Sequence, residues 1–212
     1  MRRNRIGTKT GDLWGWQVED IKKMTGPLAV QEYIQELISN PSFNQGNDPS
    51  AVDKIIECPP QVDPNVWKYE QVRQFVLELN LLVTTLKDIC NKTSCPTMKG
   101  SQDSEYLCAA HKSPINCSAI DYMVHNLDQS TSVLLNIKNY SSRVSIGETK
   151  NLDTIVRRLY RLFSHTYYFH QEIFEEFEKH MFLCERFTKF TVKTGLLEEG
   201  MTNIPPAAFV HK

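Results

Sequence analysis

The clearest pattern of apolar positions in the chain runs from Asn65 to Cys90. Apolar side chains recur there every three or four residues, and neither glycine nor proline interrupts them. This spacing places them on one face of an α-helix, so it predicts a long helix that is buried along that face. Its apolar members are Val72, Phe75, Val76, Leu79, Leu82, Val83, Leu86 and Ile89.

Three other segments repeat the helical pattern. Residues 28–39 predict a short helix, residues 119–137 predict a longer one, and the stretch from Leu152 to about Thr194 is long enough for two consecutive helices. Together with the helix at residues 65–90, these segments predict an all-α fold around a four-helix bundle.

The segments outside the predicted helices are rich in residues that break regular structure. Residues 40–65 hold five prolines among polar residues, which exclude a long helix and predict a loop across the surface. Residues 91–118 contain two short runs, EYLCAAH and INCSA, that predict a small β-hairpin. Residues 1–26 are polar and begin with basic side chains, so we expect an extended arm there.

The composition fits a single soluble domain. The 212 residues carry a net charge of -1, with 41% hydrophobic and 23% charged residues, which excludes a disordered chain and a generally basic nucleic-acid binder. No apolar segment is long enough for a signal peptide or a membrane span, so we expect a cytoplasmic protein, peripheral to membranes only through its partners. The six cysteines would then stay reduced, which favours metal ligands over disulfides.

One predicted helix carries a basic face. Each residue of RRLYRLFSHTYYFH, at positions 157–170, advances by about 100° around the axis, so Arg157, Arg158 and Arg161 fall within an arc of about 100°. The apolar residues fall on the opposite side, which is therefore the buried one. Asp153 is the only acid nearby, and we expect little neutralisation of the three guanidinium groups.

An arginine face of this kind favours an anionic partner. Guanidinium groups bind phosphate oxygens in pairs, so a phosphoserine or phosphothreonine peptide suits the face better than a carboxylate does. The alternative interpretation is an ordinary helix face whose arginines are only solvated.

Two histidines of the same stretch match two cysteines elsewhere in the chain. Cys90 and Cys95 form a C-x4-C motif at the end of the long helix, and His165 and His170 form H-x4-H. Two cysteines and two histidines make a closed tetrahedral set for Zn²⁺.

The placement of the two histidines raises a geometric problem. On a regular helix they lie about 140° apart, so both reach one ion only if the helix is kinked or bulged, or if one side chain reaches round from its flank. A rival pair is Cys108 with His111, for which no second pair is evident in the sequence.

The candidate zinc site does not predict catalysis. Four protein ligands leave no open position, so such a site stabilises the fold rather than activating water. The sequence also lacks the H-E-x-x-H, G-x-S-x-G and glycine-rich phosphate-loop motifs, and we expect no enzyme. A zinc hydrolase would need a base such as Glu172 or Glu175, and nucleic-acid binding would need a basic stripe that the sequence does not show.

These motifs occur together with a set of longer segments. They are RRNRIGTK, VWKYEQVRQFVLELN, LCAAHKSPINCSAIDY, SRVSI, RRLYRLFSHTYYFHQEIFEEFE and FLCERFTKF, and they span most of residues 2–193. In combination they resemble the Mob family of kinase-associated adaptors, and within it the phocein branch, whose members are found with striatins.

The resemblance implies a Mob-type fold with a small hairpin and one structural Zn²⁺ held by Cys90, Cys95, His165 and His170. It also suggests a division into an N-terminal arm at residues 1–26, a Mob/phocein domain at residues 27–195 and a C-terminal tail at residues 196–212.

The same resemblance implies a phosphopeptide site. In the coactivator branch of the family, three basic residues of this helix form a phosphothreonine pocket. They correspond to Arg157, Arg158 and Arg161. The residue corresponding to Arg157 is more usually lysine in that branch. That branch also presents an acidic patch on the long helix to AGC-class kinases of the NDR and LATS type, whereas WKYEQVR at residues 67–73 is mixed in sign. We therefore expect a non-catalytic adaptor of protein kinases and striatin-type phosphatase and kinase scaffolds, with a kinase coactivator as the alternative.

Overall fold

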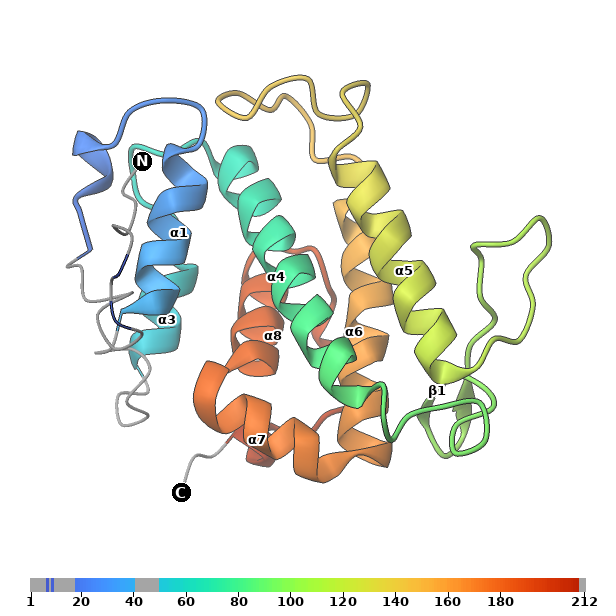
Figure 1. Ribbon diagram of the computed structural model, residues 1–212. Coiled ribbons are helices and arrows are strands. Elements are labelled where there is room, and N and C mark those ends of the chain that lie inside the picture. The colour runs from blue at the N-terminus through green and yellow to red at the C-terminus, as the bar shows by residue number, and fades with distance from the viewer. Residues whose placement is uncertain (1–6, 8, 10–17, 41–49, 210–212) are drawn as a thin grey trace.

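The computed structural model describes residues 7, 9, 18–40 and 50–209, and its regular structure is helical apart from one small sheet (Figure 1). The α-helices are α1 (Ala29–Ser39), α3 (Ser50–Ile56), α4 (Pro64–Leu86), α5 (Ala119–Leu134), α6 (Leu152–Phe169), α7 (Gln171–Met181) and α8 (Leu183–Lys193). Strands β1 (Lys99–Ser101) and β2 (Ser104–Glu105) pair antiparallel. Three 3-10 helices are η2 (Ile21–Lys23), η3 (Glu199–Met201) and η4 (Pro206–Phe209). Among the described residues, no helix combines the length and the apolar character that crossing a membrane requires.

Helix α4 lies at the centre of the structure and contacts α1, α5, α6, α7 and α8 (Figure 1). Asp63 caps its first turn, because its carboxylate accepts hydrogen bonds from the backbone N–H groups of Asn65 and Val66 at 2.7 and 3.1 Å. The long helix expected from the apolar pattern is confirmed, but it ends at Leu86. Ile89, which lies beyond that end, is 46% exposed.

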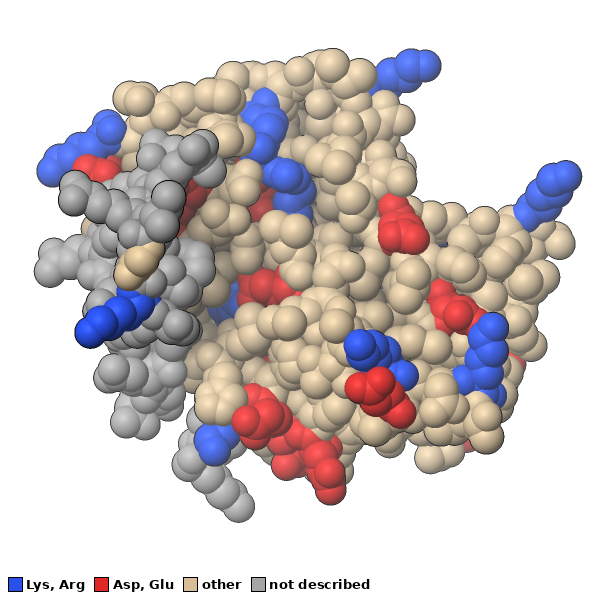
Figure 2. Space-filling view, viewed as in Figure 1, with Lys and Arg blue, Asp and Glu red and all other residues tan. Residues whose placement is uncertain are grey.

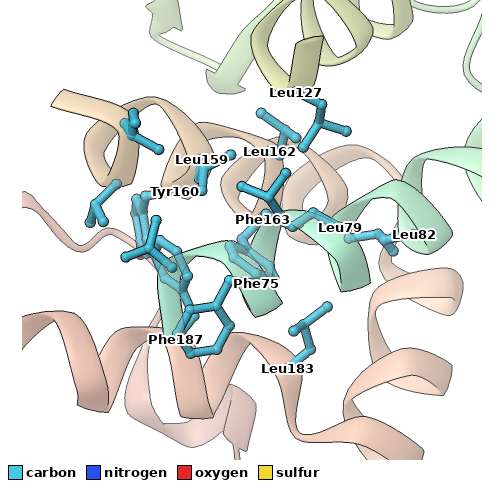
Figure 3. Close-up of a cluster of buried hydrophobic side chains, with 14 of the residues drawn as sticks. Phe75, Leu79, Leu82, Leu127, Leu159, Tyr160, Leu162, Phe163, Leu183 and Phe187 are labelled. Atoms are coloured by element: carbon cyan, nitrogen blue, oxygen red, sulfur yellow. The ribbon is translucent and has the colours of Figure 1, made fainter. Parts of the chain in front are cut away.

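The core lies between α4, α5, α6 and α8 (Figure 3). Phe187 of α8 contacts Phe75 of α4 and Phe163 of α6, with ring centroids 5.2 and 5.0 Å apart. Each of the three side chains is at most 1% exposed, and burial of such a side chain contributes about 1.5–3 kcal/mol. The apolar face of α6 is therefore fixed inward, which turns the arginines of that helix away from the core.

The stretch from Leu152 to Thr194 forms three helices, not the two that the sequence predicts. The first break is at His170, whose φ of -142° and ψ of 51° are not helical. The second is at Phe182, which adopts the left-handed conformation with φ of 48° and ψ of 35°. Helical periodicity continues across both breaks, so the apolar pattern alone does not reveal them.

Part of the segment at residues 40–65 is helical rather than a loop. Helix α3 begins at Ser50, between Pro49 and the pair Pro59 and Pro60, so the prolines flank the helix and do not interrupt it. Four of its seven residues are buried, and α3 packs against α8 and α1. The buried residues are Ala51, Val52, Ile55 and Ile56.

The predicted hairpin is displaced along the chain. Its strands are β1 and β2, which pair Lys99 with Glu105 and Ser101 with Ser104. The runs EYLCAAH and INCSA make only one isolated antiparallel bridge, between Cys108 and Ile115. The segment between β2 and α5 is thus a loop with a single bridge, and it folds back beside α5.

The two ends of the chain are only partly described. Most of residues 1–26, the expected arm, lies outside the described residues, and within it η2 places Ile21 against the protein interior. After α8, the chain remains on the core, because the Tyr160 hydroxyl accepts hydrogen bonds from the backbone N–H groups of Asn203 and Ile204 at 2.9 and 3.0 Å. The division at residues 26 and 195 stays a prediction.

Candidate functional site

The structure brings the two predicted cysteines and the two predicted histidines together. Cys90 and Cys95 occupy the turn that follows α4, and His165 and His170 belong to α6 and to the residue after it. The Cys90 Sγ lies 3.6 Å from His165 Nε2, and the Cys95 Sγ lies 3.5 Å from His170 Nε2. All four ligand atoms lie within 4.8 Å of one another, and we call these four residues the helix cluster.

The end of α6 solves the geometric problem of the histidine pair. A regular helix would separate the two side chains by about 140°, but α6 ends at Phe169 and His170 leaves the helical path. The ring centroids of His165 and His170 are consequently only 5.2 Å apart. A helix terminus, rather than a bulge within the helix, turns both rings to one point.

A hydrogen bond defines the tautomer of His165. Its Nδ1 lies 2.7 Å from the carbonyl oxygen of Lys99, which can only accept, so Nδ1 carries the proton and Nε2 presents a lone pair to the cluster. Burial lowers the pKa of His165 to about 4 and lowers that of His170 as well. Neutral imidazoles held in this way are suited to be metal ligands.

The spacing of the helix cluster fits a tetrahedral zinc ion. With Zn–S near 2.3 Å and Zn–N near 2.05 Å, a sulfur and a nitrogen ligand lie about 3.6 Å apart, which matches both measured separations. Burial and the neighbouring Cys95 thiol raise the pKa of Cys90 to about 12. A divalent cation is the group that would stabilise both sulfurs as thiolates in this setting.

The three predicted arginines differ in their surroundings. Arg157 is exposed and forms an ion pair with Asp153 at 2.6 Å, so the expectation of little local neutralisation is wrong for this residue. Arg158 and Arg161 are partly buried. The Arg158 guanidinium donates to Gln129 Oε1 at 3.2 Å, and the Arg161 guanidinium donates to the Tyr122 hydroxyl at 2.8 Å.

Arg158 and Arg161 line a cavity of about 130 Å³ between α5, α6 and the loop before α5. Its lining residues are Leu107, Cys108, Ala109, Tyr122, Asn126, Gln129, Arg158 and Arg161. Arg157 is not among them. We call this space the arginine pocket.

The sequence does not predict the aromatic and amide side chains around the arginine pocket. Tyr106 lies under Arg161, with the guanidinium carbon 4.3 Å from the centre of its ring. Tyr122 and Gln129 come from α5, which packs against α6. They could have been sought on the face of α5 that helical periodicity turns toward α6, but nothing in the sequence marks them as partners of these arginines.

Cys108 and His111, the rival pair, belong to a second group of four candidate metal-binding side chains. Cys108 and His111 are joined by Cys117 and His125, and one sulfur or nitrogen of each lies within 4.8 Å of the others. We call these residues the loop cluster. Sequence spacing concealed it, because its third and fourth members are not paired by a compact motif.

Comparison with known proteins gives a consistent result. Residues 44–199 match the family model described as Mob1/phocein family. The Drosophila melanogaster protein named MOB kinase activator-like 4 is 44% identical over 207 residues, 97% of this chain and 90% of that protein. The Caenorhabditis elegans MOB-like protein phocein is 38% identical over 207 residues with the same coverage. The Arabidopsis thaliana MOB kinase activator-like 1A is 30% identical over 156 residues, 69% of this chain and 73% of that protein.

Proposed function

Because the chain belongs to the Mob1/phocein family, whose members are regulatory adaptors, we propose that it is a non-catalytic subunit that binds protein kinases and a striatin-type phosphatase and kinase scaffold. It reads a phosphorylated serine or threonine segment of such a partner through the basic face of α6. The choice of scaffold rests on the resemblance of the sequence to the phocein branch, whose members are found with striatins.

The arginine pocket is the observation that carries the phosphopeptide proposal. Arg158 and Arg161 approach the same cavity, and each is oriented by a side chain of α5. Guanidinium groups fixed in this way lose little conformational entropy on binding and can hold phosphate oxygens bidentately. Arg157 is exposed and does not line the pocket, so a longer peptide would reach it only by displacing Asp153.

Helix α4 argues against the kinase-coactivator alternative. Its two glutamates, Glu70 and Glu78, are only 2% and 6% exposed. Glu70 accepts two hydrogen bonds from Arg143, both at 2.7 Å, and Glu78 is paired with Arg186. On the face shown in Figure 2, where α4 lies toward the viewer in Figure 1, acidic groups do not gather along this helix. A basic kinase extension would therefore find no acidic patch on α4.

Zinc has a structural role in this proposal. Cys90, Cys95, His165 and His170 would hold one ion, which joins the turn after α4 to the end of α6. Four protein ligands leave no position for a substrate or an activated water, so the ion supports the helix that carries the arginines. This ligand count also disfavours a zinc hydrolase.

Fluorescence anisotropy with labelled phosphothreonine peptides from candidate kinases and scaffolds would test the proposal. We expect the Arg158→Ala and Arg161→Ala variants to bind a peptide at least about 10-fold more weakly than the wild type, because each loses a charge-assisted hydrogen bond worth about 1.5–3 kcal/mol. The unphosphorylated peptide should bind no better to the wild type than to the variants.

Lys179→Ala is the matched control, because it removes one exposed positive charge from α7, away from the arginine pocket. It should bind the phosphopeptide as the wild type does. Equal binding by the wild type and both arginine variants, or no binding to any phosphopeptide of the panel, would contradict the peptide-reading part of the proposal.

A further inference from the structure

The loop cluster is assembled by a short fold of the chain beside α5. The backbones of Cys108 and Ile115 exchange two hydrogen bonds, of 2.7 and 3.2 Å, which turn the loop back on itself. Cys117 follows this bridge and directly precedes Ser118, the residue that caps α5. His125 projects from the second turn of α5, so loop and helix bring their side chains to one place.

The distances within the loop cluster have the spacing of a tetrahedral metal site. Cys108 Sγ lies 3.5 Å from His125 Nδ1, His111 Nε2 lies 3.1 Å from Cys117 Sγ, and Cys117 Sγ lies 3.8 Å from His125 Nδ1. These separations bracket the value of about 3.6 Å expected between sulfur and nitrogen ligands of zinc. They also resemble the separations in the helix cluster, which are 3.6 and 3.5 Å.

Ordinary hydrogen bonds between thiols and imidazoles explain this arrangement less well. A thiol has one proton to donate, and one imidazole nitrogen is enough to accept it. A single cysteine–histidine pair therefore needs no further partner. Here Cys117 approaches two imidazoles, and His125 Nδ1 approaches two sulfurs. Both cysteines are almost buried, with 3% of Cys108 and 9% of Cys117 exposed, and neither is in a disulfide. Four mutually close donor atoms suit a single ion at their centre.

We propose that Cys108, His111, Cys117 and His125 bind a second divalent metal ion of the zinc class, separate from any ion in the helix cluster. The choice of metal follows from the ligands, because thiolates and imidazoles favour zinc over the oxygen-seeking ions calcium and magnesium. With four protein ligands, this site is also closed and structural.

The second ion would fix one wall of the arginine pocket, a consequence that rests on the proposed function. Cys108 and its neighbours Leu107 and Ala109 line that pocket. Gln129 connects the wall to an arginine, since its Nε2 donates to the Ala109 carbonyl at 3.4 Å and its Oε1 accepts from Arg158 at 3.2 Å. Anchoring Cys108 therefore holds the loop at the distance at which Gln129 can bridge it to Arg158.

Metal analysis of the 212-residue protein tests the second site independently of peptide binding. The protein is expressed in zinc-supplemented medium, purified and freed of loosely bound metal. We then expect about two zinc ions per wild-type chain by inductively coupled plasma mass spectrometry. The Cys117→Ser and His111→Asn variants should retain about one. His111 is partly exposed, so its variant should keep the helical circular dichroism spectrum even if Cys117→Ser folds poorly.

Cys58→Ser is the control, because Cys58 is a cysteine outside both clusters, and it should retain both ions. Cobalt substitution gives a second readout: thiolate-to-cobalt absorption should fall by about half in His111→Asn and stay unchanged in Cys58→Ser. A wild-type protein with a single zinc, or a folded His111→Asn variant with the zinc content of the wild type, would overturn the proposal. Failure of phosphopeptide binding with two zinc ions present would count only against the proposed function.

Discussion

Gly100, a residue without a side chain, shapes the arginine pocket. A Cβ atom at this position would lie 2.7 Å from Cε2 of Tyr106 and 3.2 Å from the Ser164 hydroxyl. Tyr106 in turn supports the guanidinium group of Arg161 from below. The missing side chain thus gives the tyrosine ring the space it needs beneath the arginine.

Replacement of Gly100 by alanine should both destabilise the protein and weaken phosphopeptide binding. The added methyl group overlaps the Tyr106 ring, and overpacking of this kind costs about 1–3 kcal/mol. Displacement of the ring then moves Arg161. Urea unfolding measures the first effect, and peptide anisotropy measures the second.

Gly147→Ala is a suitable control for this experiment, since a Cβ atom there would meet nothing within 4 Å. It should leave both stability and binding close to those of the wild type. If Gly100→Ala unfolds at the same urea concentration as the wild type and binds the phosphopeptide equally well, the space at Gly100 is not needed to position Tyr106 and Arg161.

At the residue scale, the sequence predicts the members of the helix cluster but not the reason why they meet. Cys90, Cys95, His165 and His170 are recognisable by type and spacing, whereas their convergence depends on the non-helical conformation of His170. Cys117 and His125 escape prediction for a related reason, because a loop bridge and a helix position, not a short motif, bring them to Cys108.

At the scale of elements, Glu178 connects the end of α7 to the beginning of α8. Its carboxylate accepts hydrogen bonds from the backbone N–H groups of Cys184 and Glu185 at 2.9 and 2.8 Å. These N–H groups belong to the first turn of α8, where backbone donors have no acceptor within their own helix. The left-handed residue Phe182 allows the chain to turn so that the end of one helix caps the next.

Loss of this cap should be costly. In Glu178→Ala both N–H groups are left buried without an acceptor, and each such group costs about 1–3 kcal/mol. We therefore expect a clear fall in the free energy of unfolding, measured by urea titration. Glu176→Ala, which removes an exposed carboxylate from the same helix, should change stability by less than about 0.5 kcal/mol. Equal effects of the two substitutions would contradict the capping role of Glu178.

The sequence predicts the presence of helices better than it predicts their ends. The apolar pattern locates α1, α4 and α5 to within a few residues. It predicts two helices where α6, α7 and α8 form three, because the breaks at His170 and Phe182 carry neither glycine nor proline. It misses α3, because prolines on both sides hide a helix that tertiary packing against α8 stabilises.

At the scale of the whole molecule, Glu178 should make stability depend on pH. Burial raises its pKa from the ordinary value of 4.5 to about 7. Between pH 4.5 and 7, the folded protein holds this proton while the unfolded chain loses it. The contribution of Glu178 to stability is therefore fully present below about pH 4.5 and declines as pH rises to about 7, by up to about 1.4 kcal/mol per pH unit.

The difference between wild type and Glu178→Gln isolates this contribution, because the other titrating groups, including the cysteines and histidines of the two clusters, are common to both proteins. Urea unfolding at pH 5, 6, 7 and 8 should show the wild type losing stability relative to the variant as pH rises, with a plateau above about pH 7. A difference that stays constant across this range would show that Glu178 titrates at its ordinary pKa.

The four residues of the helix cluster lie farther apart along the chain than those of the loop cluster, which affects when each cluster can form during synthesis. In the helix cluster, Cys90 and His165 are 75 residues apart, and so are Cys95 and His170. In the loop cluster, Cys108 and His125 are separated by only 17 residues. Contacts between near neighbours form faster and close smaller loops. The loop cluster can therefore form once His125 has emerged from the ribosome, whereas the helix cluster needs α6. The wall of the arginine pocket formed by residues 107–109 can then be in place before the helix that it faces.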